Sequence, residues 1–126
     1  MRKRVYLERK VVDRLLSYCR SVHPDEGILL LRGRVKKDRI IVSEVVIPPF
    51  ALHAESFSSF LPHMLPIDFS IVGAAHAHPS GVVKPSLEDL NNFYGRIMVI
   101  VGYPYESEAD IGVFDSEGSR ALFSVI

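Results

Sequence analysis

Two histidines one residue apart, with an acidic residue shortly after them, are the part of this sequence best suited to chemistry. His76 and His78 lie in a run of small apolar residues, and Asp89 follows after ten intervening residues. Side chains two apart on a β-strand project from the same face, so both imidazoles can reach one point in space. The intervening segment is long enough to reverse and present Asp89 to that point. The pattern predicts a metal site with one open tetrahedral position, as in catalytic zinc sites.

Each part of this pattern also has a purely structural explanation. An isolated His-x-His in a strand is more often packing than a ligand pair. Ser86 and Asp89 fit a helix N-cap with an acidic residue at the third helical position, where the helix dipole favours negative charge. Capping and ligation are compatible, because the same position keeps Asp89 ionised, as a ligand must be. Glu26, by itself, would be a solvated charge at a strand end. The residues alone leave a metal site and a structural polar cluster equally open.

The elements that must position these residues predict an α/β (α+β) fold, in which a mixed central β-sheet is flanked by helices. An amphipathic pattern predicts a helix over residues 8–22, stopped by Pro24. Ser86 is expected to open a short helix with Leu87 among its inward residues. Strands are expected at 26–31, 40–47, 70–78 and 97–101, and a hairpin at 109–114 and 121–126. Residues 50–66 are expected to form a loop beside the site. One domain is expected over 1–126.

Composition narrows the class of protein. Fifteen Lys and Arg side chains balance fifteen Asp and Glu, but the balance is uneven along the chain. Residues 1–39 hold twelve basic and five acidic side chains (+7), whereas residues 40–126 hold three basic and ten acidic (−7). Only Tyr6 and Tyr18 fall among these basic residues, too few for the stacking platform of a single-strand binder, so no nucleic-acid partner is expected.

The single cysteine and the hydropathy pattern give expectations about the cellular environment. Cys19 is alone, so no intramolecular disulfide can form, and a reducing, cytoplasmic compartment is expected. No stretch approaches the eighteen or more apolar residues of a membrane span, so no membrane partner is expected. The sequence leaves homo-oligomerisation open.

Taken together, these residues resemble the JAMM (MPN-plus) family of zinc metalloproteases. Glu26 is followed by an apolar strand and lies upstream of His76-Ala77-His78-Pro79, with Ser86 and Asp89 at the family's spacings. The resemblance covers nearly the whole chain and is closest to the small archaeal and bacterial type. It implies a JAMM/MPN-like, cytidine-deaminase-like architecture. It also implies a catalytic Zn²⁺ held by His76, His78 and Asp89 with water in the fourth position, Glu26 as general base and Ser86 as hydrogen-bond donor to the developing oxyanion.

The activity implied by the resemblance is that of an isopeptidase. Its substrate would be an amide bond after the C-terminus of a ubiquitin-like or sulfur-carrier protein. Two alternatives remain, namely an iron enzyme with two His and one carboxylate ligand, and a non-catalytic scaffold of the same fold. Because small ubiquitin-like proteins are often acidic, the basic helix face and the turn from Arg32 to Arg39 are expected to steer such a partner toward the metal.

Overall fold

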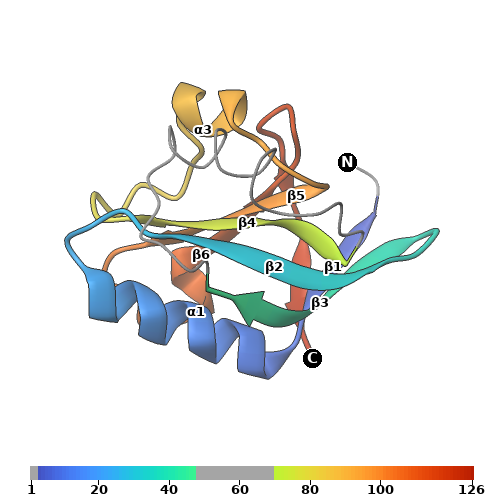
Figure 1. Cartoon of the computed structure of the whole chain (residues 1–126), viewed down its shortest axis with the longest axis horizontal. Helices are drawn as coiled ribbons and strands as arrows, with labels where there is room; N and C mark the ends of the chain where they lie inside the picture. The colour runs from blue at the N-terminus through green and yellow to red at the C-terminus, as the bar shows by residue number, and fades with distance from the viewer. Residues whose placement is uncertain (1–2, 48–69) are drawn as a thin grey trace.

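A mixed β-sheet with helices packed on its two faces forms the framework of the protein (Figure 1). The computed structural model describes residues 3–47 and 70–126. Its eight strands follow the order β7-β6-β5-β4-β2-β3-β1-β8. The strands are β1 (Arg4–Leu7), β2 (Ile28–Val35), β3 (Arg39–Val46), β4 (Ile71–His78), β5 (Ile97–Gly102), β6 (Ile111–Phe114), β7 (Arg120–Ala121) and β8 (Phe123–Val125). The helices are α1 (Arg9–Val22), α3 (Leu87–Asn91) and the 3-10 turn η1 (Glu108–Asp110). The predicted mixed fold class is confirmed, and the loop expected at 50–66 lies outside the described residues.

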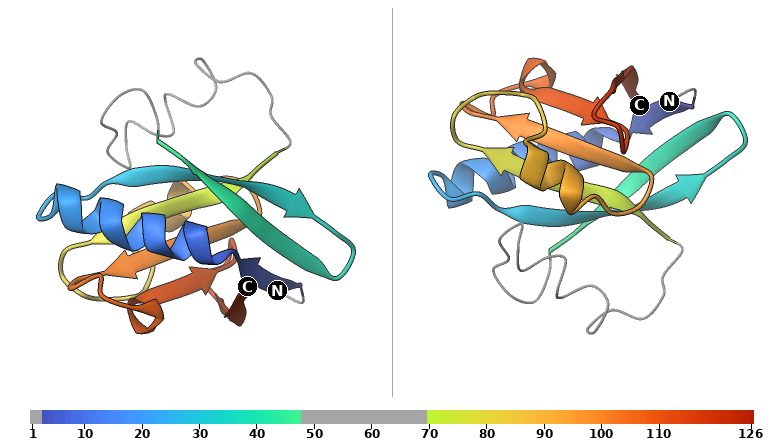
Figure 2. Two further views of the ribbon diagram at one scale, coloured as in Figure 1. Left: turned by 90° about the horizontal axis from the view of Figure 1, so that it is seen from below. Right: turned by 90° about the horizontal axis from the view of Figure 1, so that it is seen from above.

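Helix α1 covers one face of the sheet because its apolar residues recur every three or four positions. The buried residues of this stripe are Val11, Val12, Leu15, Leu16 and Cys19. Figure 2 shows the helix lying across the strands when the molecule is viewed from below. The helix ends just before Pro24, as predicted, because proline lacks the N–H that a further turn would need. This face of the sheet therefore has a continuous apolar cover.

The central strands β2, β4 and β5 divide their side chains between two cores. Strand β4 pairs antiparallel with β2 and parallel with β5, which makes it interior to the sheet. Its residues Ala75 and Ala77 belong to the large core beneath α1. Ala74 belongs to a smaller cluster on the opposite face, together with Ile28 and Leu30 of β2. Because side chains alternate along a strand, His76 and His78 of β4 lie on the face opposite Ala75 and Ala77.

The C-terminal strands differ from the predicted hairpin. Strand β6 pairs with β7, but β8 leaves this pair and lies parallel to β1 at the other edge of the sheet. Only Leu122 separates β7 from β8, so the sheet curls until its two edges lie within about 8 Å of each other. Strand β8 thereby gives the otherwise open edge of β1 a hydrogen-bonding partner. Strand β6 also begins later than expected, because residues 108–110 form the turn η1.

The short helix α3 lies on the face opposite α1, as the view from above in Figure 2 shows. It begins after Ser86, as predicted, but Leu87 is 77% exposed instead of facing inward. The reason is geometric, since the buried residue of this helix is Asp89, and a position two residues earlier lies on the opposite side of a helix. Within residues 3–47 and 70–126, neither helix has the length and apolarity needed to cross a membrane.

Candidate metal centre

The two histidines of the motif project from the sheet face opposite α1. Within β4, His76 and His78 alternate with Ala75 and Ala77, whose side chains lie in the core beneath the helix. His76 is paired with Ile28 of β2 and Ile100 of β5, and its side chain is buried. His78 is the last residue of the strand and is less buried. The strand therefore delivers both imidazoles to one side of the sheet, at its end.

Asp89 reaches the same place because α3 begins with a capping box. The Ser86 hydroxyl accepts a hydrogen bond from the Asp89 backbone N–H at 3.0 Å, and the Ser86 backbone N–H donates to Asp89 Oδ2 at 2.9 Å. These reciprocal bonds satisfy two backbone groups at the helix start and fix the side chain of Asp89. The capping interpretation and the proximity to the histidines thus hold at the same time.

The carboxylate of Asp89 contacts both imidazoles. His76 Nδ1 lies 3.3 Å from Asp89 Oδ1, and His78 Nε2 lies 3.1 Å from Asp89 Oδ2. Burial raises the pKa of Asp89, but the hydrogen bonds with His76, His78 and the Ser86 backbone outweigh burial and hold that pKa well below its usual range. The group is therefore a carboxylate, the form in which it would bind a cation.

His78 is oriented by a backbone carbonyl on its other side. Its Nδ1 lies 2.9 Å from the carbonyl oxygen of Val82, which can only accept a hydrogen bond. Burial lowers the pKa of His78, but the bonds to Asp89 and Val82 and the negative charges of Asp89 and Glu26 raise it above its usual value. Both ring nitrogens therefore face acceptors, and a cation would take the place of the Nε2 proton while Nδ1 keeps its hydrogen bond to Val82.

Glu26 lies at the same end of the sheet, opposite His78. Ile28 of β2 pairs with His76, and the Ala77 backbone N–H donates to the Gly27 carbonyl at 3.0 Å. The same register places Glu26 across from His78, and its charge acts on that imidazole. The Glu26 side chain is exposed. The position that appeared from sequence to be an ordinary strand end is thus next to the histidine pair.

Two glycines that sequence reasoning missed make room for the loop over this site. A Cβ on Gly102 would lie 2.9 Å from Val83 Cγ2, and one on Gly112 would lie 2.7 Å from Val83 Cγ1. Both distances are shorter than real carbon contacts allow, so Val83 sits against the bare backbone of β5 and β6. The neighbouring residue is Val82, whose carbonyl orients His78. No sequence signal linked these glycines to the motif, because their contact with it is purely tertiary.

The donor set fits a zinc ion, although the three side chains contact one another instead of one shared point. Two ligand atoms at about 2.0–2.1 Å from a tetrahedral zinc are separated by roughly 3.3 Å, close to both distances between the histidines and Asp89. The buried Nε2 of His76 has no hydrogen-bond partner among the described residues. Asp89 uses a different oxygen for each ring, and the described chain contains no group of three ligand side chains in full metal-binding geometry.

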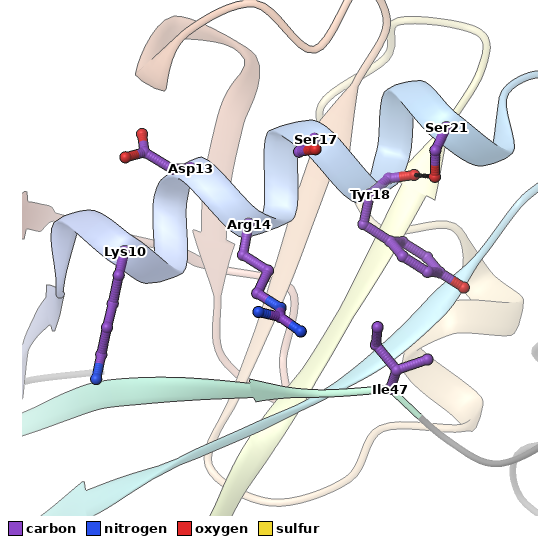
Figure 3. Close-up of a pocket in the computed structure, with 7 residues that line it drawn as sticks. All are labelled: Lys10, Asp13, Arg14, Ser17, Tyr18, Ser21 and Ile47. Atoms are coloured by element: carbon purple, nitrogen blue, oxygen red, sulfur yellow. Dashed lines mark hydrogen bonds between the residues drawn. The ribbon is translucent and has the colours of Figure 1, made fainter.

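The basic turn near Arg39, and Lys10 and Arg14 of the helix α1, lie away from the proposed ligands. A hollow of about 530 Å³ lies between α1 and the end of β3, and Figure 3 shows Arg14, Tyr18 and Ile47 turned toward it. None of the residues proposed for the metal site lines it. The turn that ends at Arg39 lies at the far end of β2 from Glu26, a span of eight strand residues or roughly 26 Å. Salt screens exposed charges over about 8–10 Å, so steering by this turn would act from a distance, and its role in guiding a substrate stays a prediction.

Comparison with known proteins places these residues in a family. Residues 8–112 match the model for prokaryotic homologues of the JAB domain. A curated relative from Haloferax volcanii, described as a probable metalloprotease, is 34% identical over 129 residues, which cover 91% of this chain and 80% of the relative.

Solved structures show the same similarity. A JAB1/MPN domain protein from Archaeoglobus fulgidus is 31% identical, with a TM-score of 0.69 over 96% of this chain and 98% of that one. A structure described as a JAMM metalloprotease-like zinc site in the proteasome and signalosome is 28% identical, with a TM-score of 0.69 over 97% of both chains. A protein from Desulfitobacterium hafniense, at 18% identity and a TM-score of 0.64 over 97% of this chain and 92% of that one, shares the fold.

Proposed function

The chain belongs to the family of prokaryotic JAB-domain homologues, and from this premise we propose that it is a zinc-dependent metalloprotease. Its reaction would be hydrolysis of an amide bond after the C-terminus of a ubiquitin-like or sulfur-carrier protein. The observation that carries the proposal is the meeting of His76, His78 and Asp89 at the end of β4, with Glu26 in register beside them. These three ligand types leave one coordination position open for chemistry.

The metal would be held by His76, His78 and Asp89. When bound in such a site, zinc lowers the pKa of water to about 7 and polarises a carbonyl group. Glu26 then has the role of general base, because its exposed carboxylate is near enough for its charge to act on His78 and can take up a proton there. The same carboxyl group can return the proton to the leaving amine.

Ser86 would stabilise negative charge on the substrate carbonyl oxygen. In the capping box its oxygen accepts the Asp89 N–H, so its own hydroxyl hydrogen remains free to donate. One such donor contributes roughly 3 kcal/mol to transition-state stabilisation in other hydrolases. The backbone bond from Ser86 to Asp89 keeps this hydroxyl at a fixed place relative to the ligands.

The decisive test is the Glu26→Gln variant. Incubation with a panel of ubiquitin-like and sulfur-carrier conjugates, with mass spectrometry of the products, should locate the cleaved bond in the wild-type protein. We expect Glu26→Gln to bind zinc as the wild type does and to cleave about 10²–10⁴-fold more slowly.

Glu88→Gln is the matched control. Glu88 is an exposed acidic residue in the first turn of α3 with no proposed role in the reaction. Its replacement should leave the rate unchanged. Cleavage by Glu26→Gln at the parental rate would remove Glu26 from the mechanism. A wild-type protein that binds zinc but cleaves no conjugate, or whose cleavage a chelator does not stop, would overturn the proposed activity.

A further inference from the structure

Three aromatic rings from two distant segments pack together beside the connection that carries Glu26. The ring of His23 stacks on Tyr103 with centroids 4.7 Å apart, and it meets the ring of Tyr105 edge-on at 5.5 Å. The two tyrosine rings also pack edge-on against each other at 5.8 Å. His23 Nδ1 lies 2.9 Å from the Tyr105 hydroxyl, within hydrogen-bond distance. We call these three residues the aromatic clamp.

Tyr105 holds its place in the clamp in a strained backbone conformation. Its φ of 58° lies in the left-handed region, which a bulky side chain rarely occupies. The residue is almost fully buried, the Arg20 guanidinium donates to its carbonyl, and its own N–H donates to the Gly102 carbonyl at 3.0 Å. Such strain persists only where the surrounding contacts over-determine it, and it is found most often at functional sites. These contacts fix the Tyr105 ring against His23.

One side of the clamp is attached to the strand that carries the two histidines of the candidate site. The Tyr103 backbone N–H donates to the His78 carbonyl at 3.1 Å. Tyr103 directly follows Gly102, the last residue of β5, and Gly102 pairs with His78 in the parallel register of β4 and β5. The two tyrosines are therefore fixed relative to the end of β4, where the proposed ligands lie.

The other side of the clamp begins the connection that carries Glu26. This connection between α1 and β2 consists of residues 23–27, with His23 first and Glu26 fourth. At its far end the Gly27 carbonyl accepts a hydrogen bond from the Ala77 N–H at 3.0 Å. Glu26 thus lies between an anchor on β4 and an anchor in the aromatic clamp. Its own side chain is exposed, so packing around that side chain does not fix it.

From these contacts, and resting on the function proposed above, we propose that His23 is a positioning residue for Glu26, acting through the aromatic clamp. A general base must lie within hydrogen-bond reach of the proton that it removes. A displacement of about 1 Å in a catalytic site can lower the rate by about 10²-fold. His23 fixes the connection of residues 23–27 relative to the end of β4, and thereby keeps the Glu26 carboxylate close to the proposed ligands.

The first test compares His23→Ala, which removes the stacked ring and the hydrogen bond, with Tyr105→Phe, which removes only the hydroxyl. For cleavage of a conjugate, we expect kcat to fall by about tenfold or more in His23→Ala and by a smaller factor in Tyr105→Phe. The KM and the zinc content should stay unchanged. In the Glu26→Gln background neither replacement should lower kcat much further, because the group that the clamp positions is already absent. A merely structural role would lower kcat by the same factor in both backgrounds.

A second test measures the clamp without any catalysis. Backbone relaxation by NMR in the metal-free protein should give order parameters near about 0.85 for Glu26 and Gly27 in the wild type, and clearly lower values, toward about 0.6, in His23→Ala. Val11→Ala is the matched control, because Val11 is almost fully buried on the same helix but lies near its opposite end. It should lower stability and leave both kcat and these order parameters unchanged.

The outcomes separate this proposal from the proposed function. A normal kcat in both clamp variants, or a loss that is equally large in the Glu26→Gln background, would overturn the positioning role and leave the protease proposal intact. If the wild type cleaves no conjugate, the proposed function fails and the order parameters alone decide whether His23 fixes the connection. Unchanged order at Glu26 in His23→Ala would then show that it does not. Should His23→Ala fail to fold, Tyr105→Phe is measured in the same two ways.

Discussion

The two faces of the central sheet are built in different ways. Beneath α1, buried apolar residues form one continuous cluster of 22 members in the described structure. On the opposite face, the buried residues fall into two clusters of four and three members, and the buried polar side chains of His76 and Asp89 also lie on this side. Gly102 and Gly112 add no side chains to this face, and Val83 of the neighbouring loop packs against their backbone.

The difference indicates a division of labour within one small fold. The α1 face can supply most of the hydrophobic stabilisation, because apolar burial is roughly additive over its area. The other face interrupts its apolar packing with groups that stabilise the fold less but can hold a cation. If this division is real, substitutions on the two faces should separate stability from activity.

The largest difference between loss of activity and loss of stability is expected from His78→Ala. Loss of one of three proposed ligands should abolish zinc binding and reduce cleavage by about 10³-fold or more, since a bound metal contributes several kcal/mol to transition-state stabilisation. The metal-free variant should unfold within about 1 kcal/mol of the metal-free wild type, because only hydrogen bonds to Asp89 and Val82 are lost. Thermal unfolding with and without added zinc, beside conjugate cleavage, measures both quantities. A variant that still gains stability from zinc would show that His78 is not a required ligand.

The opposite result is expected beneath α1. Leu15 is fully buried, so Leu15→Ala should lower the free energy of unfolding by about 3 kcal/mol through lost transfer energy and a residual cavity. Activity per folded molecule should stay the same. Urea unfolding monitored by circular dichroism gives the first number, and cleavage rates well below the unfolding midpoint give the second. Leu122→Ala, at an exposed leucine, should change stability by less than about 0.5 kcal/mol.

Gly102 offers a test of how the stability of the fold and the binding of metal are coupled. In Gly102→Ala the new methyl group would meet Val83 at 2.9 Å and the Gly81 carbonyl at 3.1 Å, so the loop over His78 must shift. We expect a loss of about 1–3 kcal/mol in stability and roughly tenfold weaker zinc binding, because the Val82 carbonyl that orients His78 moves with the loop.

Adding Val83→Ala should partly restore zinc affinity, since it removes the clashing methyl groups. Competition with a chromophoric chelator measures the affinity of each variant. Equal affinity in Gly102→Ala and wild type would mean that the loop does not position His78.

Local pattern was enough to predict the α1 face. The three- and four-residue spacing around Leu15 and the stop at Pro24 define the helix without reference to the rest of the chain. The separate motifs were combined into one predicted site only through the resemblance to a known family. The match over residues 8–112 supports that resemblance. The roles of Glu26, Ser86 and the three ligands remain predictions, although the structure places these residues close together.

What sequence missed depended on tertiary contacts. Strand β1 was overlooked, although the alternation of exposed Arg4 with buried Val5 and Leu7 was a usable signal. The departure of β8 from its expected hairpin follows from closure of the sheet edges, which no local pattern encodes. Tyr103 gave no signal either, because its contacts with His23 and His78 join residues distant in sequence.

The smallest effect on stability and activity is expected from replacing Cys19, the buried thiol on the α1 face. Burial raises the pKa of its thiol to about 12, with a small opposing effect of Arg20, so the thiolate is almost absent at pH 8. Native protein should therefore resist iodoacetamide, whereas protein unfolded in urea should be alkylated at the rate of an ordinary cysteine. Cys19→Ala should cost about 1 kcal/mol in stability and leave cleavage unchanged. Mass spectrometry of alkylated protein gives the first result, and inactivation of the native protein on alkylation of Cys19 would show that the α1 face also takes part in function.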